Sequence, residues 1–175
     1  MIYYEQNNIR IRDLEPADVQ VFVDGERAQG WQGASPEKLE TRLQNRADGE
    51  CVVLAADYNG EQAGYVSLYW NPKNGAFANQ NIPEIVDFNV LVKFRRNGIG
   101  SKLMDVCEEL AAQKCDQVCL GVGLYTDYGT AQRMYVKRGY IPDGSGVWYQ
   151  DKICGPYEDC RNDDDLVLYL SKSLR

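Results

Sequence analysis

A short run rich in arginine and glycine could bind an anion. It comprises Arg95, Arg96, Asn97, Gly98, Ile99 and Gly100. The first N–H groups of a helix lack intrahelical partners and carry about half a positive charge. Glycines let an anion approach such N–H groups without a Cβ in the way, and arginines add charge-assisted donors. At the start of a helix, this run predicts a cradle for phosphate groups.

The flanking segments place the run between a strand and a helix. The stretch from Ile85 to Val92 is strongly apolar and predicts a central strand, although Asp87 and Asn89 lie inside it. Apolar residues then recur at helical spacing at Ile99, Leu103, Val106 and Leu110. We expect that helix to end near Lys114.

Two other phosphate-binding loops do not fit the sequence. A Walker A loop needs G-x-x-x-x-G-K-[ST], which the chain lacks. A dinucleotide fingerprint needs three glycines, but Thr126 stands where the third should follow Gly121 and Gly123. The pattern that remains is [Q/R]-x-x-G-x-[G/A], which Arg95, Gly98 and Gly100 satisfy.

In this context the pattern resembles the pyrophosphate loop of the GNAT N-acetyltransferase superfamily. Phe88-Asn89-Val90 stands where that superfamily has its apolar strand before the loop. The segment from Thr130 to Tyr140 resembles its second signature, an A-x-x-x-Y followed by a glycine and an aromatic residue. The element order is similar from Ile9 to Leu170. Gly129 departs from the family, which often has an asparagine there to contact the pantetheine arm.

The resemblance implies that acetyl-CoA is a co-substrate and that an amine attacks its thioester directly. A backbone N–H on the central strand, that of Val90, would polarise the acetyl carbonyl. The residues implied to bind the cofactor are Phe88, Val90, Arg95, Arg96, Asn97, Gly98, Ile99, Gly100 and Ser101.

The same resemblance assigns proton-transfer roles. Tyr135 matches the family tyrosine that protonates the leaving thiolate, although it could instead serve only core packing. Asp87 is our first choice for the base that accepts the amine proton, Glu84 is the second, and water alone is the third. The chain contains 0 histidines, which excludes Ser-His and Cys-His catalytic units.

The residues that bind the acceptor amine are expected in the first two helices, the loop around Trp31 and the loop from Asn71 to Pro83. Trp31, Tyr69 and Trp70 could line an amine pocket through stacking or cation–π contacts, or could be ordinary packing aromatics. We expect no metal site. Cys154 and Cys160 could form a redox pair or half a metal site, but incidental cysteines beside a loop are the simpler interpretation.

Composition limits the class of protein. The 175 residues are 44% hydrophobic and 26% charged, and we expect one N-acetyltransferase domain over residues 1–175. The net charge of −7 argues against nucleic-acid binding. The sequence has neither an apolar run long enough for a membrane helix nor a visible secretory signal. We therefore expect a cytoplasmic protein whose 6 cysteines are reduced.

The pattern of elements predicts an α/β fold with a central mixed, mostly antiparallel sheet flanked by helices, in the order β-α-α-β-β-β-α-β-α-β-β. Pro16 and Pro36 are each expected at the first position of a helix. Asn59-Gly60 predicts a tight hairpin turn. Thr126 or Asp127 is expected to cap the short helix that carries Tyr135.

These inferences favour an enzyme that acetylates a primary amine of a small molecule or a peptide. One alternative is a regulatory module that binds acetyl-CoA without turnover, and another is a binding domain that uses the fold without the cofactor. Release of CoA separates the first two, and a thermal shift with acetyl-CoA tests the third. Dimers are common among such enzymes, and a homodimer is compatible with the sequence.

Overall fold

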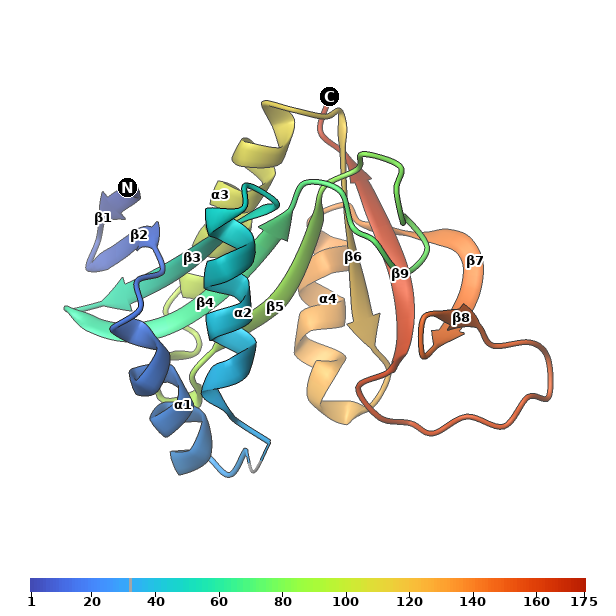
Figure 1. The fold of residues 1–175 in the computed structure, drawn as a ribbon, viewed down its shortest axis with the longest axis horizontal. Helices are drawn as coiled ribbons and strands as arrows, with labels where there is room; N and C mark the ends of the chain where they lie inside the picture. The colour runs from blue at the N-terminus through green and yellow to red at the C-terminus, as the bar shows by residue number, and fades with distance from the viewer. Residues whose placement is uncertain (32) are drawn as a thin grey trace. The chain divides into compact units, whose positions relative to one another are not determined.

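The computed structural model describes residues 1–31 and 33–175, which form two compact units (Figure 1). The first unit contains residues 1–69 and 86–110, and the second contains residues 70–85 and 111–175. Strand β5 (Glu84–Val90) begins in the second unit and continues into the first.

The first unit contains a ladder of antiparallel strands. These are β1 (Ile2–Gln6), β2 (Ile9–Asp13), β3 (Cys51–Tyr58) and β4 (Glu61–Tyr69), each paired with the next. β5 follows β4 in the strand order, and the N–H of Leu91 just beyond β5 donates to the carbonyl of Ala63 at 2.9 Å. The β3–β4 hairpin closes at Asn59-Gly60 with φ values of 52° and 84°, which confirms the predicted turn.

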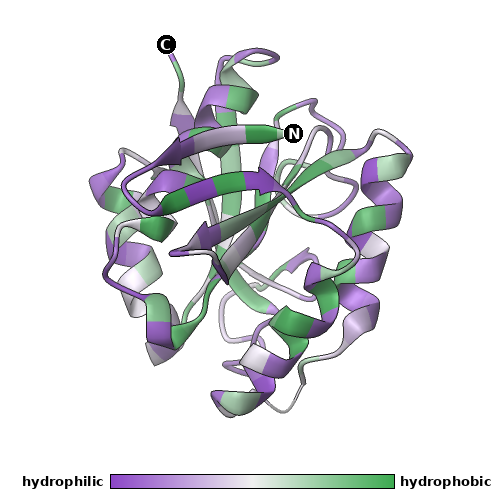
Figure 2. Ribbon diagram, turned by 90° about the vertical axis from the view of Figure 1, so that its left-hand side faces the viewer, coloured by the Kyte–Doolittle hydropathy of each residue, from purple (hydrophilic) through white to green (hydrophobic). Residues whose placement is uncertain are grey.

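Three helices pack in this unit: α1 (Asp18–Ala28), α2 (Pro36–Ala47) and the part of α3 (Ile99–Ala112) up to Leu110. Hydrophobic and hydrophilic residues are mixed within each helix (Figure 2), as expected for helices with one buried side. Phe22 of α1 is fully buried, and its ring meets that of Tyr65 on β4 edge to face at a centroid distance of 5.0 Å.

Pro36 is the first residue of α2, as predicted, but Pro16 does not open α1. A hydrogen-bonded turn from Glu15 to Asp18 comes first, and α1 begins at Asp18. The cause is Asp18 itself, whose carboxylate accepts a hydrogen bond from the N–H of Glu15 at 2.8 Å and thereby fixes the turn.

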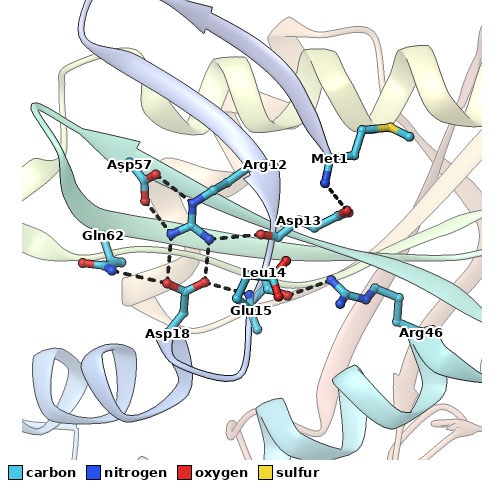
Figure 3. A network of polar contacts seen from close by, with 9 residues as sticks. All are labelled: Met1, Arg12, Asp13, Leu14, Glu15, Asp18, Arg46, Asp57 and Gln62. Atoms are coloured by element: carbon cyan, nitrogen blue, oxygen red, sulfur yellow. Dashed lines mark hydrogen bonds and ion pairs between the residues drawn. The ribbon is translucent and has the colours of Figure 1, made fainter.

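Arg12 links the start of α1 to the sheet through hydrogen bonds (Figure 3). Its guanidinium on β2 donates to both carboxylate oxygens of Asp18, at 2.6 and 2.8 Å, and to both oxygens of Asp57 on β3, at 2.8 and 2.9 Å. Gln62 on β4 donates to Asp18 as well. Burial alone would raise the pKa of Asp18, but the hydrogen bonds from Arg12 and Glu15 outweigh it and lower that pKa.

The second unit has its own strand order. Glu84 and Ile85 of β5 pair in parallel with β6 (Gln117–Gly123), and β6 pairs antiparallel with β9 (Leu166–Ser173). β9 pairs antiparallel with β7 (Ile141–Tyr149), which pairs with β8 (Lys152–Ile153). A 3₁₀ turn over Thr126–Tyr128 leads into helix α4 (Gly129–Lys137). Phe77, Cys119 and Tyr169 form a buried apolar cluster in this unit.

The predicted fold class is confirmed, because parallel pairing of β5 with β6 occurs among antiparallel pairs and helices flank the sheet. Two strands were missed. β1 is mostly exposed and β8 has two exposed residues, so neither carries a buried alternating pattern. The expected cap of α4 was also wrong: the residue before the helix is Tyr128, and it makes no side-chain cap bond.

Within the described residues, no helix is both long and apolar enough to cross a bilayer.

Candidate active site

The loop from Arg95 to Gly98 contains two left-handed residues, Arg96 with φ 67° and Gly98. Gly98 adopts a left-handed conformation with φ 80°, and a Cβ placed on it would meet no atom within 4 Å. Open space therefore lies beside the first N–H groups of α3. Asn97 fixes the turn, since its amide donates to the carbonyl of Phe94 at 3.1 Å and its Oδ1 accepts from Tyr58 at 3.3 Å.

Gly100 lies against the side chains of β5. A Cβ at this position would lie 3.1 Å from Cζ of Phe88 and 3.7 Å from Cγ2 of Val90, so α3 begins close to β5. Ile99 between the two glycines is 1% exposed, so its side chain packs in the core and only its backbone can serve a ligand. Arg95 and Arg96 are exposed, and Nε of Arg95 donates to the carbonyl of Val90 at 3.0 Å.

The backbone of β5 changes course at Asp87, which has φ 53° although it lies within a strand. The recorded ladder with β6 covers Glu84 and Ile85, before this point. After it, Phe88 and Val90 approach Gly100 of α3, whereas Asn89 bonds to Glu26 of α1. β5 therefore separates a face toward the glycine loop from a face toward α1 and α2.

A buried polar cluster occupies the second face. Glu26 is 2% exposed, and its Oε1 accepts hydrogen bonds from the Tyr65 hydroxyl at 2.5 Å and from the Asn89 amide at 2.7 Å. The Tyr65 hydroxyl in turn accepts from Nζ of Lys38 at 2.8 Å. Burial and the neighbouring Glu26 carboxylate raise the pKa of Tyr65, so this hydroxyl keeps its proton.

A second set of bonds links α2 to Asp87. Nε of Arg42 lies 2.5 Å from Oδ2 of Asp87, and Nη1 of Arg42 donates to the Tyr69 hydroxyl at 2.9 Å. Asn45, one turn further along α2, donates to the same hydroxyl at 2.6 Å. Burial alone would lower the pKa of Arg42, but Asp87 outweighs it and raises that pKa.

Gly64 allows β4 to lie against β5 at this place. A Cβ on Gly64 would lie 2.6 Å from the carbonyl oxygen of Asn89 and 3.1 Å from Cα of Val90. No real Cβ fits at the shorter distance, so the backbone of β5 occupies space that any side chain at residue 64 would need.

The predicted site residues therefore fall into two groups. The first unit brings together Asp87, Phe88, Val90, the loop from Arg95 to Ser101, and Tyr69. Trp31 is also in this unit and 44% exposed, with Nζ of Lys38 lying 5.8 Å from its ring centroid.

Tyr135, Trp70 and Glu84 belong to the second unit. Tyr135 on α4 is 5% exposed, with its ring centroid 5.9 Å from that of Tyr140. Nζ of Lys114 lies 3.6 Å from the ring centroid of Trp70, and Glu84 is buried where β5 pairs with β6.

Sequence reasoning missed the cluster around Glu26. One signal was present, because Val19, Phe22, Val23 and Glu26 share the i, i+3, i+4, i+7 spacing of a buried helix side. A carboxylate on that side must find buried donors, and it does. Lys38, Arg42 and Tyr65 gave no such signal, because their partners are distant in sequence.

None of the six cysteines is in a disulfide. Across the residues that the structure describes, no group of three or more cysteine, aspartate or glutamate side chains could hold a metal ion.

Comparison with known proteins assigns the class. Residues 20–140 match the model of the acetyltransferase (GNAT) family. The uncharacterized N-acetyltransferase YhfO of Bacillus subtilis (strain 168) is 30% identical over 111 residues, which are 63% of this chain and 70% of that protein.

Solved structures share the fold. The Salmonella typhimurium acetyltransferase that modifies the N-terminal serine of ribosomal protein L7/L12 superposes with a TM-score of 0.73 at 13% identity, over 99% of both chains. The yncA protein of Salmonella typhimurium, solved with acetyl-CoA, gives 0.67 at 15% identity, over 97% of this chain and 95% of that one.

The fold and the glycine loop thus define an acyltransferase of the acetyl-CoA-dependent class. The chain belongs to the acetyltransferase (GNAT) family. The predicted family, enzyme class and co-substrate are confirmed.

Proposed function

We propose that this enzyme transfers an acetyl group from acetyl-CoA to a primary amine of a small molecule or a peptide, by direct attack of the amine on the thioester. The observation that carries the proposal is the division of β5. One face of the strand meets the glycine loop, and the other presents Asp87 and Asn89 to charged groups of α1 and α2. Asp87 and Phe88 are consecutive residues of β5, so a thioester held beside the glycine loop and an amine beside Asp87 could come into contact at this part of the strand.

The glycine loop would hold the pyrophosphate of the co-substrate. The open space beside Gly98 fits an anion, and the backbone N–H groups of Gly98, Ile99, Gly100 and Ser101 would be its donors. The guanidinium groups of Arg95 and Arg96 and the amide of Asn97 add polar contacts at the rim. Phe88 and Val90 would lie along the pantetheine arm, and the N–H of Val90 would stabilise the oxyanion that forms on the acetyl carbonyl.

Two side chains would move protons. We assign Asp87 as the base that accepts a proton from the attacking amine, directly or through water, because its partly exposed carboxylate is positioned by Arg42 at the turn in β5. Glu84 is the second choice and water the third. Tyr135 would protonate the departing CoA thiolate.

The acceptor would lie beside Trp31, Tyr69 and Trp70. The exposed ring of Trp31 supports this assignment. A peptide amine is kept as a candidate acceptor because one structural relative acts on the N-terminal serine of a protein. The six cysteines, none of which is in a disulfide, support a cytoplasmic location, where cysteines stay reduced.

The test is release of CoA, separated by chromatography, from acetyl-CoA and a panel of polyamines, amino acids, aminoglycosides and short peptides. We expect amine-dependent CoA release with at least one class. Binding of acetyl-CoA without release for any class would favour the regulatory module instead. A homodimer would be seen in the same preparation by light scattering.

A further inference from the structure

We propose that the acceptor is a small zwitterion of the α-amino acid type, whose carboxylate is held by Lys38 and Arg42 and whose amine lies against Asp87. This inference rests on the proposed function, because it specifies the acceptor of the same reaction. It follows from the donors that α2 leaves unused and from the charges that solvent can reach.

Arg42 uses only part of its guanidinium. Nε is bonded to Asp87 and Nη1 to the Tyr69 hydroxyl, while Nη2 has no hydrogen-bond partner among the described residues. The side chain is 27% exposed, so an incoming ligand can reach it. A guanidinium with its position fixed by two bonds is a preorganised donor for a carboxylate.

Lys38 lies one turn before Arg42, on the same side of α2. One bond from its ammonium group goes to the Tyr65 hydroxyl, at 2.8 Å. The same nitrogen lies 5.2 Å from the Tyr65 ring centroid and 5.8 Å from that of Trp31. An ammonium group has three donors, so two can serve a ligand. Lys38 and Arg42 therefore present two cations to one anionic group.

The accessible charges select the acceptor class. Glu26 is 2% exposed and its Oε1 accepts two hydrogen bonds, so its carboxylate is withdrawn from solvent. The side chain of Asp87 is 19% exposed. The two cations are balanced by the two carboxylates, so the net charge of this cluster is about zero. A ligand with an anionic group next to its amine matches such a paired surface, whereas a polyamine offers no anion to Lys38 and Arg42.

The spacing of the charges favours an α-amine. Because Arg42 and Asp87 are in direct contact, the carboxylate site and the amine site are neighbours. One carbon separates the two charged groups of an α-amino acid, which matches adjacent sites. A peptide N-terminus lacks the neighbouring carboxylate and would leave the cations unpaired. The exposed Trp31 ring would contact the side chain of the amino acid.

The experiment compares matched acceptors at saturating acetyl-CoA. Each of several α-amino acids is assayed beside its amide and its decarboxylated amine, and kcat/KM is measured by CoA release. The intact enzyme should prefer the amino acid on the order of 10- to 100-fold, the range expected for one charge-assisted hydrogen bond. Lys38→Gln should remove most of this preference, and Lys38→Arg should restore it.

Arg46→Gln is the matched control. Arg46 lies on the same helix and loses the same charge, but it donates to the carbonyl of Leu14 at 2.7 Å instead of facing the cluster. The preference for the amino acid should survive in this variant. The midpoint of thermal unfolding is measured for all variants, so that loss of folding is recognised.

Each contrary result has a distinct meaning. If amides or decarboxylated amines are used as well as or better than amino acids, the zwitterion proposal is overturned while amine acetylation stands. An equal loss toward amino acids and amides in folded Lys38→Gln also overturns it, because Lys38 is then only structural. Absence of CoA release with every amine overturns the proposed function itself.

Discussion

Nε of Arg42 lies 2.5 Å from Oδ2 of Asp87, and this pair joins α2 to β5 at the residue where the strand adopts a left-handed backbone. Asp87 therefore has two properties that can be separated experimentally. Asparagine tolerates the same left-handed backbone conformation as aspartate, but it lacks the negative charge.

Asp87→Asn should keep the fold and lower kcat on the order of 10²-fold, because the amide cannot accept a proton from the amine. The KM for acetyl-CoA should be unchanged. Steady-state kinetics with the best acceptor checks both values. An unchanged kcat would transfer the base role to Glu84 or to water.

Tyr135→Phe should also lower kcat on the order of 10²-fold, because the thiolate then leaves without a proton donor. The ring and its packing against Tyr140 are preserved in this variant, and the midpoint of thermal unfolding is measured beside kcat to check that the protein is folded. The clearest readout is kcat with both substrates saturating, compared between the two proteins. Full activity of the phenylalanine variant would mean that Tyr135 only fills the core.

Gly98→Ala should weaken binding of acetyl-CoA on the order of tenfold, because a methyl group would enter the space where phosphate is expected. Gly139→Ala is a matched control, since Gly139 has φ 89° and equally open surroundings at the end of α4. Each variant should lose about 1 kcal/mol of stability through its left-handed backbone. Calorimetric titration with acetyl-CoA should distinguish them, and equal affinities would remove Gly98 from the cradle.

Arg12→Gln should lower the free energy of unfolding by about 3–5 kcal/mol at neutral pH, because it leaves the carboxylates of Asp18 and Asp57 without their cation. The folded-state pKa of Asp18 is lowered, so its contribution is complete above the ordinary value of about 4 and is lost as pH falls below it. The free energies of unfolding of the intact protein and the variant, measured in urea, should therefore differ less at pH 3 than at pH 7. A constant difference would mean that Arg12 acts through packing alone.

Ser67→Ala should leave the free energy of unfolding unchanged or raise it by up to about 1 kcal/mol. Oγ of Ser67 is fully buried on β4 without a hydrogen-bond partner among the described residues, so removing it removes an unsatisfied hydroxyl. Chemical denaturation measures the change. A loss above about 1 kcal/mol would show that this hydroxyl is bonded to an ordered water.

The sequence was a good guide where local rules decide the structure. The turn at Asn59-Gly60, the start of α2 at Pro36 and the left-handed Gly98 all follow from backbone preferences of the residues themselves. The left-handed backbone of Arg96, with φ 67°, does not. The acceptor side was only partly predictable. Asp87 was singled out because it interrupts an apolar strand, but its partner Arg42 is 45 residues away, and such pairing depends on tertiary packing.

The same limit explains Glu26 and Asn89. They lie 63 residues apart, and each alone looks like a polar residue in an apolar pattern. Only the folded chain shows that they satisfy each other. The capping error at α4 has a local cause instead, since the 3₁₀ turn over Thr126–Tyr128 takes the positions where a cap would stand.

The contact between Gly64 and the backbone of β5 has an evolutionary consequence. Any side chain at residue 64 would displace the strand that carries Asp87 and Val90, so this position should be nearly invariant in a library of functional variants. Divergence toward new acceptors is then expected at positions away from this contact, such as Lys38 and Arg42. The β4–β5 pair would stay unchanged among such variants, while substitutions in α2 would alter which acceptor is bound.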